Sequence, residues 1–256
     1  MKKLNFVLFK ALLALSLISV FSLLQAQEDE DNADVAMLWS VTAVDGKDAE
    51  FEAAVKGFHE FMADKDGHFD WQWYSVLTGE DTGSYLARSG GHNWADMDAE
   101  HDWDDEVDAY FEENVSPFID TATRSITVGE DEIVNWPESL DEYNYFRITD
   151  WQIKQGQGNA FETNLKKIHA ALQEGGWGGY YYFAYNSSGG RSGSVVLVSP
   201  HKNWADMAEK EPDFFSVLSE QLGEDGAGEL LDEFSTTYRA GDVTTLRWRK
   251  DMNPDD

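Results

Sequence analysis

The sequence predicts an α+β protein built from two similar units, each with the element order β-α-β-β-α-β. Two observations predict this class. The pentapeptide Asn-Trp-Ala-Asp-Met occurs at residues 93–97 and again at residues 203–207, an offset of 110 residues. In each copy, short aromatic or β-branched segments also alternate with segments whose apolar residues recur at helical spacing.

The same offset aligns residues well outside the pentapeptide, and no insertion is needed over residues 46–97. A single register over so long a stretch indicates a tandem duplication. The offset exceeds the roughly 20 to 50 residues of solenoid and propeller repeats, so each copy is expected to be a small domain with its own core. The aligned pairs include Gly46 and Gly156, Phe51 and Phe161, Glu52 and Glu162, Lys56 and Lys166, His59 and His169, and Gly83 and Gly193.

The first residues have the pattern of a secretory signal peptide. Three lysines precede or flank the start of an apolar run over residues 11–24, and Ala26 offers a small residue for cleavage. The run is shorter than the roughly 20 residues that a membrane-spanning helix needs. We therefore expect residues 1–26 to be removed, a secreted or periplasmic location and no membrane insertion after cleavage. Residues 27–34 are strongly acidic and are expected to form a flexible leader.

The composition argues against several classes of partner. The chain has 49 acidic and 19 basic residues and a net charge of −30, which would repel nucleic acid and anionic lipid. The acidic run over residues 96–104 resembles a calcium loop, but His101 and Val107 replace the glycine and the acid that such a loop requires. No histidine spacing typical of zinc sites occurs. We expect no metal and no cofactor.

Each copy is expected to contain four strands and two helical regions. In the first unit, residues 35–137, the strands are predicted over 35–44, 69–77, 85–89 and 126–136, with helices over 51–62 and after the pentapeptide. In the second unit, residues 138–256, they are predicted over 145–153, 180–185, 194–199 and 243–248, with helices over 161–172 and after the pentapeptide. The polar residues 137–142 are the predicted linker.

This order is that of a ferredoxin-like unit, in which two helices cover one face of the sheet and leave the other bare. The bare face is predicted to be aromatic, so two such sheets can bury it against each other. In this the chain resembles the dimeric α/β-barrel superfamily, with both units in one chain so that the dimer is intramolecular. The resemblance implies a monomer with pseudo-dimeric halves. The residues predicted to line its cavity are Trp39, Trp71, Trp73, Trp94, Trp151, Tyr181, Phe183 and Trp204.

Asn93 and Asn203 stand where a strand ends and a helical region begins, with an aspartate three residues later. This arrangement favours helix capping by the asparagine side chain. The alternative is that the Asn-Trp pairs line the mouth of the barrel.

His59 and His169 are the candidate catalytic residues, because each flanks the apolar stripe of the first helix of its unit. The alternative to proton transfer is a partly buried histidine that bonds a backbone carbonyl.

Members of the superfamily include cofactor-free monooxygenases, haem-degrading enzymes and small isomerases. Trp94 and His101 loosely match the haem-degrading type, but Glu211 stands at the second position equivalent to His101, and asparagine is absent from the first strands. We predict an exported protein that binds a small apolar or aromatic molecule. The alternatives are a cofactor-independent monooxygenase or isomerase, and an envelope stress or interaction protein without catalysis.

Overall fold

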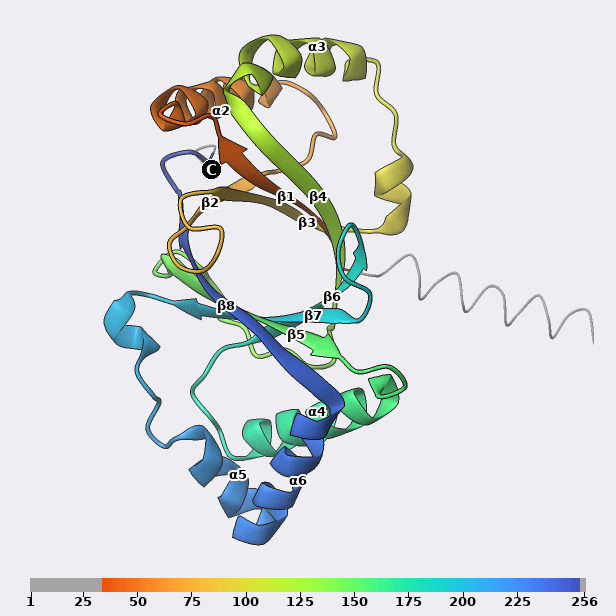
Figure 1. Ribbon diagram of the computed structural model, residues 1–256, viewed down its shortest axis with the longest axis vertical. Coiled ribbons are helices and arrows are strands. Elements are labelled where there is room, and N and C mark those ends of the chain that lie inside the picture. Colours follow the sequence, from red (N-terminus) through yellow and green to blue (C-terminus); the bar gives the residue numbers. More distant parts are fainter. Residues whose placement is uncertain (1–33, 254–256) are drawn as a thin grey trace, which may run out of the picture.

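The computed structural model describes residues 34–253, so the predicted signal peptide and all but the last residue of the predicted leader lie outside it. In this range eight strands form one closed antiparallel barrel (Figure 1). The strands are β1 Val35–Ala43, β2 Gln72–Val76, β3 Tyr85–His92, β4 Ile119–Gly129, β5 Tyr145–Ile153, β6 Tyr182–Ser188, β7 Ser194–His201 and β8 Tyr238–Trp248.

The barrel consists of two four-stranded sheets with the same internal order. The strands run β4-β1-β3-β2 in the first half and β8-β5-β7-β6 in the second. Two antiparallel seams join the sheets: β2 pairs with β8, where Tyr74 lies opposite Trp248, and β4 pairs with β6, where Thr127 lies opposite Asn186. The predicted α+β class and barrel closure are therefore confirmed.

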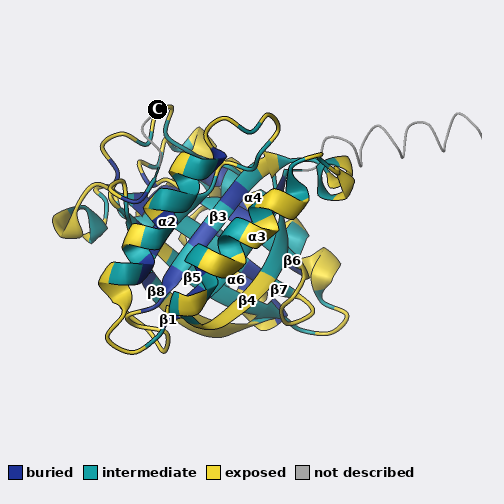
Figure 2. Cartoon of the chain, turned by 90° about the horizontal axis from the view of Figure 1, so that it is seen from above, coloured by how far each residue is buried: buried dark blue, intermediate teal, exposed yellow. Residues whose placement is uncertain are grey.

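The helices lie on the outside of the barrel, in one layer over each half (Figure 1). The first half carries α2 Asp48–Met62 and α3 Asp104–Asn114, and the second carries α4 Gly158–Glu174, α5 Phe214–Leu222 and α6 Glu224–Thr237. Their solvent-facing sides are largely exposed, whereas the strands beneath are mostly buried or intermediate (Figure 2). The amphipathic patterns of α2 and α4 place Phe51 and Phe161, both fully buried, against the sheets.

The fourth strand of each half begins earlier than predicted. β4 covers residues 119–129, not 126–136, and β8 begins at Tyr238, not at residue 243. Residues 120–124 are polar or small and exposed, so they lack the hydrophobic signal by which a strand is recognised in sequence. They are nevertheless paired, because the ladder with β1 continues as far as Ala43.

Each pentapeptide forms a short 3₁₀ helix, η1 Trp94–Asp98 and η3 Trp204–Met207, with its asparagine as the N-cap. The Asn93 side chain accepts from the Asp96 amide at 3.2 Å, and the Asp96 carboxylate accepts from the Asn93 amide at 2.8 Å. The capping interpretation is confirmed at both sites. In the second copy the Asp206 carboxylate accepts from the Lys202 amide, at 3.0 Å.

The segment after the last strand of each half packs against the opposite half. Ile133 follows β4 and is 0% exposed in the core under α4, α5 and α6. Met252 follows β8 and is 1% exposed in the core formed with Phe51 and Val55 of α2. The predicted boundary between residues 137 and 138 thus falls after a residue that already belongs to the second core.

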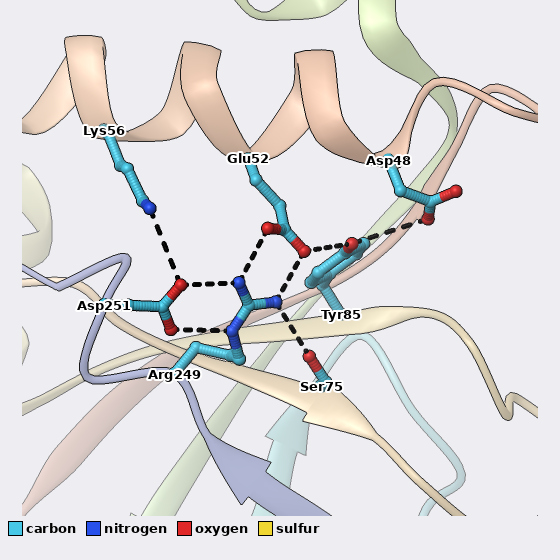
Figure 3. Close-up of polar contacts among 7 residues, drawn as sticks. All are labelled: Asp48, Glu52, Lys56, Ser75, Tyr85, Arg249 and Asp251. Atoms are coloured by element: carbon cyan, nitrogen blue, oxygen red, sulfur yellow. Dashed lines mark hydrogen bonds and ion pairs between the residues drawn. The ribbon is translucent and has the colours of Figure 1, made fainter.

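Ion pairs anchor the segment after β8 to the first half (Figure 3). The Arg249 guanidinium donates to both oxygens of Glu52 on α2, at 2.5 and 2.7 Å, and to both oxygens of Asp251. The Tyr85 hydroxyl donates to Glu52 at 2.9 Å. Bonding to Arg249 holds the pKa values of Glu52 and Asp251 below their usual range.

Candidate functional site

A cavity of about 270 Å³ lies in the second half, between the outer face of the sheet and helices α4, α5 and α6. Its wall is almost entirely apolar. The aromatic lining comes from three strands, the loop before β6 and helices α5 and α6, and the helices also add aliphatic side chains. The lining residues are Ile133, Trp151, Leu165, Ile168, His169, Leu172, Trp177, Tyr181, Phe183, Leu197, Ser199, Phe214, Leu231, Phe234 and Tyr238. We call this cavity the helix-side pocket.

Alternation along the strands places the aromatic residues of the pocket on the outer face of the sheet. Trp151 on β5 and Phe183 on β6 point the same way, and their rings lie 5.9 Å apart. Trp151 also stacks on Tyr238 at 4.7 Å. This packed aromatic floor leaves the pocket above it, under the helices.

A few of the residues that line this apolar space carry polar groups. His169 Nδ1 lies 2.9 Å from the Tyr181 hydroxyl, and the tautomer of the imidazole decides which of the two donates. Trp177 Nε1–H is buried and has no hydrogen-bond partner among the described residues. Ser199 contributes a hydroxyl from β7.

Burial shifts the pKa values of His169 and Tyr181 toward their neutral forms. It lowers the pKa of His169, which favours the neutral imidazole near pH 7, and it raises the pKa of Tyr181. A neutral imidazole bonded to a neutral phenol can accept one proton at histidine and relay it through the pair.

Trp177 lies between two pairs of glycines, in the sequence Gly-Gly-Trp-Gly-Gly. The helix α4 ends at Glu174, and the Trp177 amide donates to the Leu172 carbonyl at 3.0 Å. A Cβ at Gly179 would lie 2.2 Å from the indole ring, so only glycine leaves room for the ring there. Sequence reasoning missed Trp177, although a tryptophan flanked by glycines is a detectable signal.

The predicted lining residues do not face the space between the two sheets. Trp39, Trp73, Trp151 and Phe183 lie on the outer, helix-facing side of their strands, and Tyr181 precedes β6 on the same side. This part of the sequence interpretation is wrong. Residues at alternate positions line the barrel interior instead, such as Leu38 and Tyr74.

The predicted residues of the two halves have different surroundings. Trp151, Tyr181, Phe183 and His169 come together in the helix-side pocket. In the first half Trp39 and Trp73 pack against the core, with the Trp73 ring 5.5 Å from that of Phe51.

The other predicted residues line neither the helix-side pocket nor the barrel interior. His59 is partly buried on α2, its Nε2 has no partner within residues 34–253, and burial lowers its pKa. Trp71 lies beside Phe69, with ring centroids 6.4 Å apart. Trp94 and Trp204 are 36% and 53% exposed.

Trp94 and His101, which loosely match the haem-degrading type, do not lie together in either cavity. Trp94 lies at the surface, while His101 stacks on Trp103 at 4.2 Å and bonds Asp104 through its backbone amide. His101 lines neither cavity. Within residues 34–253 no three histidine, aspartate or glutamate side chains group as metal ligands, and no helix is long and apolar enough to span a bilayer.

No protein-family model and no curated protein matches this sequence. Solved structures do resemble its fold. A candidate monooxygenase from Lactobacillus acidophilus NCFM matches with a TM-score of 0.53 at 10% identity, over 84% of this chain and 94% of that chain. A mutant chlorite dismutase from Candidatus Nitrospira defluvii matches with a TM-score of 0.51 at 11% identity, over 84% and 90%. A candidate monooxygenase from Fusobacterium nucleatum matches with a TM-score of 0.50 at 9% identity, over 85% and 93%. The chain therefore has the dimeric α/β-barrel fold, as the sequence predicted.

Proposed function

We propose that this protein binds a small apolar or aromatic molecule that carries a hydrogen-bond acceptor, and that the helix-side pocket is the binding site. The observation that carries the proposal is the unpartnered Nε1–H of Trp177, a buried donor on a residue that lines this largely apolar cavity. A buried donor without a partner costs roughly 1 to 3 kcal/mol. A ligand oxygen would remove that cost, while the aromatic floor contributes apolar contact.

Binding of 1-naphthol, followed by calorimetry, tests this proposal. Trp177→Phe removes the indole N–H but keeps a ring, so we expect roughly tenfold weaker binding of 1-naphthol. Trp39→Phe makes a related change in the other half and should leave the affinity unchanged. Failure of wild type to bind 1-naphthol, or equal affinities in wild type and Trp177→Phe, would overturn the proposal.

A second candidate is a cofactor-independent monooxygenase or isomerase in which His169 is the catalytic proton acceptor. Its support is the His169–Tyr181 contact at 2.9 Å together with the lowered histidine pKa. A neutral imidazole can take a proton from a phenol or from an activated C–H bond of a molecule in the pocket. The fold itself accommodates many chemistries and does not select among them.

Dioxygen uptake and isomer formation with hydroxynaphthalenes as substrates test the enzymatic candidate. His169→Gln should abolish turnover while 1-naphthol still binds, and Tyr181→Phe should shift the pH profile of the rate. His59→Gln is the matched control, because His59 lies on the equivalent helix but does not line the pocket. Turnover that survives in His169→Gln would exclude this histidine as the base.

We also propose that the protein acts outside the cytoplasm as a monomer after removal of residues 1–26. The support is the lysine-flanked apolar run over residues 11–24. Amino-terminal sequencing of the protein recovered from the culture medium or periplasm tests the cleavage, and sedimentation equilibrium tests the monomer.

We propose, finally, that the two halves arose by tandem duplication. The repeated pentapeptide, the shared strand order and the reciprocal burial of Ile133 and Met252 all support this origin.

A further inference from the structure

The barrel interior holds a second cavity, of about 780 Å³, between the two sheets. Aliphatic side chains from both halves form much of its wall, including Leu38, Leu86, Ile148, Val198 and Leu246. The cavity reaches the surface, because Arg191 and Asp242 line it and are exposed. Its volume falls in the range of about 300 to 1,000 Å³ that is typical of ligand sites.

Arg88 on β3 contributes a positive charge to this wall. It lies in one row of the barrel with Leu38 on β1 and Gln72 on β2. Arg88 is partly buried, and its guanidinium makes no hydrogen bond or ion pair to any residue between 34 and 253. Five donors in a partly enclosed site therefore have no protein acceptor there.

Two carboxylates of this wall accept hydrogen bonds from neutral groups, and the third, Asp242, is exposed. Asp34 accepts from the Tyr182 hydroxyl and, at 3.1 Å, from the Gly91 amide. Asp150 accepts from the Ser194 hydroxyl at 2.7 Å. These neutral donors leave both carboxylates charged, but they satisfy part of their hydrogen-bonding capacity, whereas the Arg88 guanidinium has no acceptor among the described residues. An anionic ligand group would therefore match the wall at Arg88.

Two glycines leave room for the Arg88 guanidinium and for the Tyr182 hydroxyl. A Cβ at Gly90 would lie 2.4 Å from an Arg88 terminal nitrogen, so the guanidinium extends along β3 over Gly90. A Cβ at Gly129 would overlap the Tyr182 hydroxyl. Tyr74 and Tyr182 line the same cavity as Arg88. Burial raises the pKa values of both phenols, and the Arg88 charge opposes both rises.

We propose that the barrel cavity binds an apolar organic monocarboxylate, with the carboxylate on Arg88 and the hydrocarbon part against Leu38, Leu86 and Val198. A carboxylate matches the planar fork of the guanidinium and can accept two parallel hydrogen bonds. The net charge of −30 opposes entry of an anion at a distance, but salt screens that field beyond about 8 Å at physiological ionic strength. This site is separate from the helix-side pocket and does not rest on the function proposed for it.

Calorimetry of the full mature chain with octanoate and with 1-octanol tests this inference. The two probes share a hydrocarbon chain and differ in charge, so wild type should bind octanoate at least roughly tenfold more tightly. Arg88→Gln should remove this preference, and Arg88→Lys should keep part of it. Arg124→Gln is the matched control, because Arg124 is an exposed residue of β4 that lies over the outward-facing Trp39 ring.

Three results would overturn the inference: no octanoate binding at millimolar concentration, equal affinity for both probes, or an unchanged preference in Arg88→Gln. Thermal melting of each variant verifies that it is folded. Trp177→Phe should bind octanoate as wild type does. Loss of octanoate binding in that variant would place octanoate in the helix-side pocket instead.

Discussion

Met252 occupies in the first half the place that Ile133 occupies in the second: each lies four residues beyond the end of a fourth strand and is buried in the core of the opposite half. The halves are thus joined by two pairs of hydrogen-bonded strands. In addition, each half contributes one buried side chain to the core of the other. Ion pairs with lysines at equivalent helix positions add to these contacts: Lys166 pairs with Glu132, and Lys56 pairs with Asp251.

Truncation of Met252 or of Ile133 to alanine should destabilise the whole barrel. We expect Met252→Ala and Ile133→Ala each to lower the free energy of unfolding by about 2 to 5 kcal/mol, because each leaves a cavity in a packed core. Urea denaturation measures the change. Val243→Ala, at a position 43% exposed, is the control and should cost less than about 0.5 kcal/mol. A cost this small at Met252 would show that the carboxyl-terminal segment does not stabilise the first half.

The Arg249 ion pairs should contribute stability that depends on pH. The pKa values of Glu52 and Asp251 are depressed in the folded protein, so their contribution is complete above the unfolded values of about 4.3 and 3.9 and is lost as the pH falls through the folded values. We expect Arg249→Met to cost about 1.5 to 3 kcal/mol at pH 7. The difference from wild type should shrink steadily below about pH 4. A difference that stays constant down to pH 2 would contradict this origin.

The strands and first helices could be predicted because their patterns are local. The span of β5, Tyr145–Ile153, agrees with its prediction, and the apolar spacing in α2 and α4 was visible in the sequence. The sequence did not show which face of each sheet points into the barrel and which faces the helices. Both faces of β1 are apolar, with Leu38 toward the barrel and Trp39 toward the helices, so alternation alone does not tell which face meets which layer.

Ligand affinity in the helix-side pocket should fall in acid. Burial lowers the pKa of His169, and a ligand that fills the pocket would desolvate the imidazole further and lower its pKa again. Binding therefore releases a proton wherever His169 is partly protonated, and it weakens as the pH falls through the lowered pKa of His169. Calorimetry of 1-naphthol across this range measures the slope. His169→Gln should flatten it and His59→Gln should not; a slope retained in His169→Gln would assign it to another group.

The caps of the two pentapeptides should affect stability but not binding. Asn93→Ala and Asn203→Ala each remove an acceptor for the amide three residues later and should cost about 0.5 to 2 kcal/mol in thermal or urea unfolding. Neither asparagine lines a described cavity, so the affinity for 1-naphthol should stay at the wild-type value in both variants. A lower affinity in a folded variant would revive the alternative that these segments contact ligand.

The candidate site depended on features that no local pattern contains. His169 and His59 are equivalent in sequence, yet only His169 lines the helix-side pocket, where Trp177 and the loop that carries it form part of the wall. Ile133 reaches the same wall from the other half of the chain. Contacts between residues so distant in sequence arise from barrel closure, and spacing within one unit cannot predict them.

The first unit alone, residues 27–137, should not remain a monomer. Without the second half, β2 and β4 become open sheet edges, since their partners β8 and β6 are absent. The core under α2 also loses Met252. A second copy can supply both: β2 of one copy would pair with β4 of the other, in the manner of the two seams of the intact chain, and Ile133 would enter the place of Met252. Sedimentation equilibrium should therefore find a dimer or larger species at micromolar concentration. A soluble monomer of this fragment that unfolds cooperatively would show that each sheet is stable without the other.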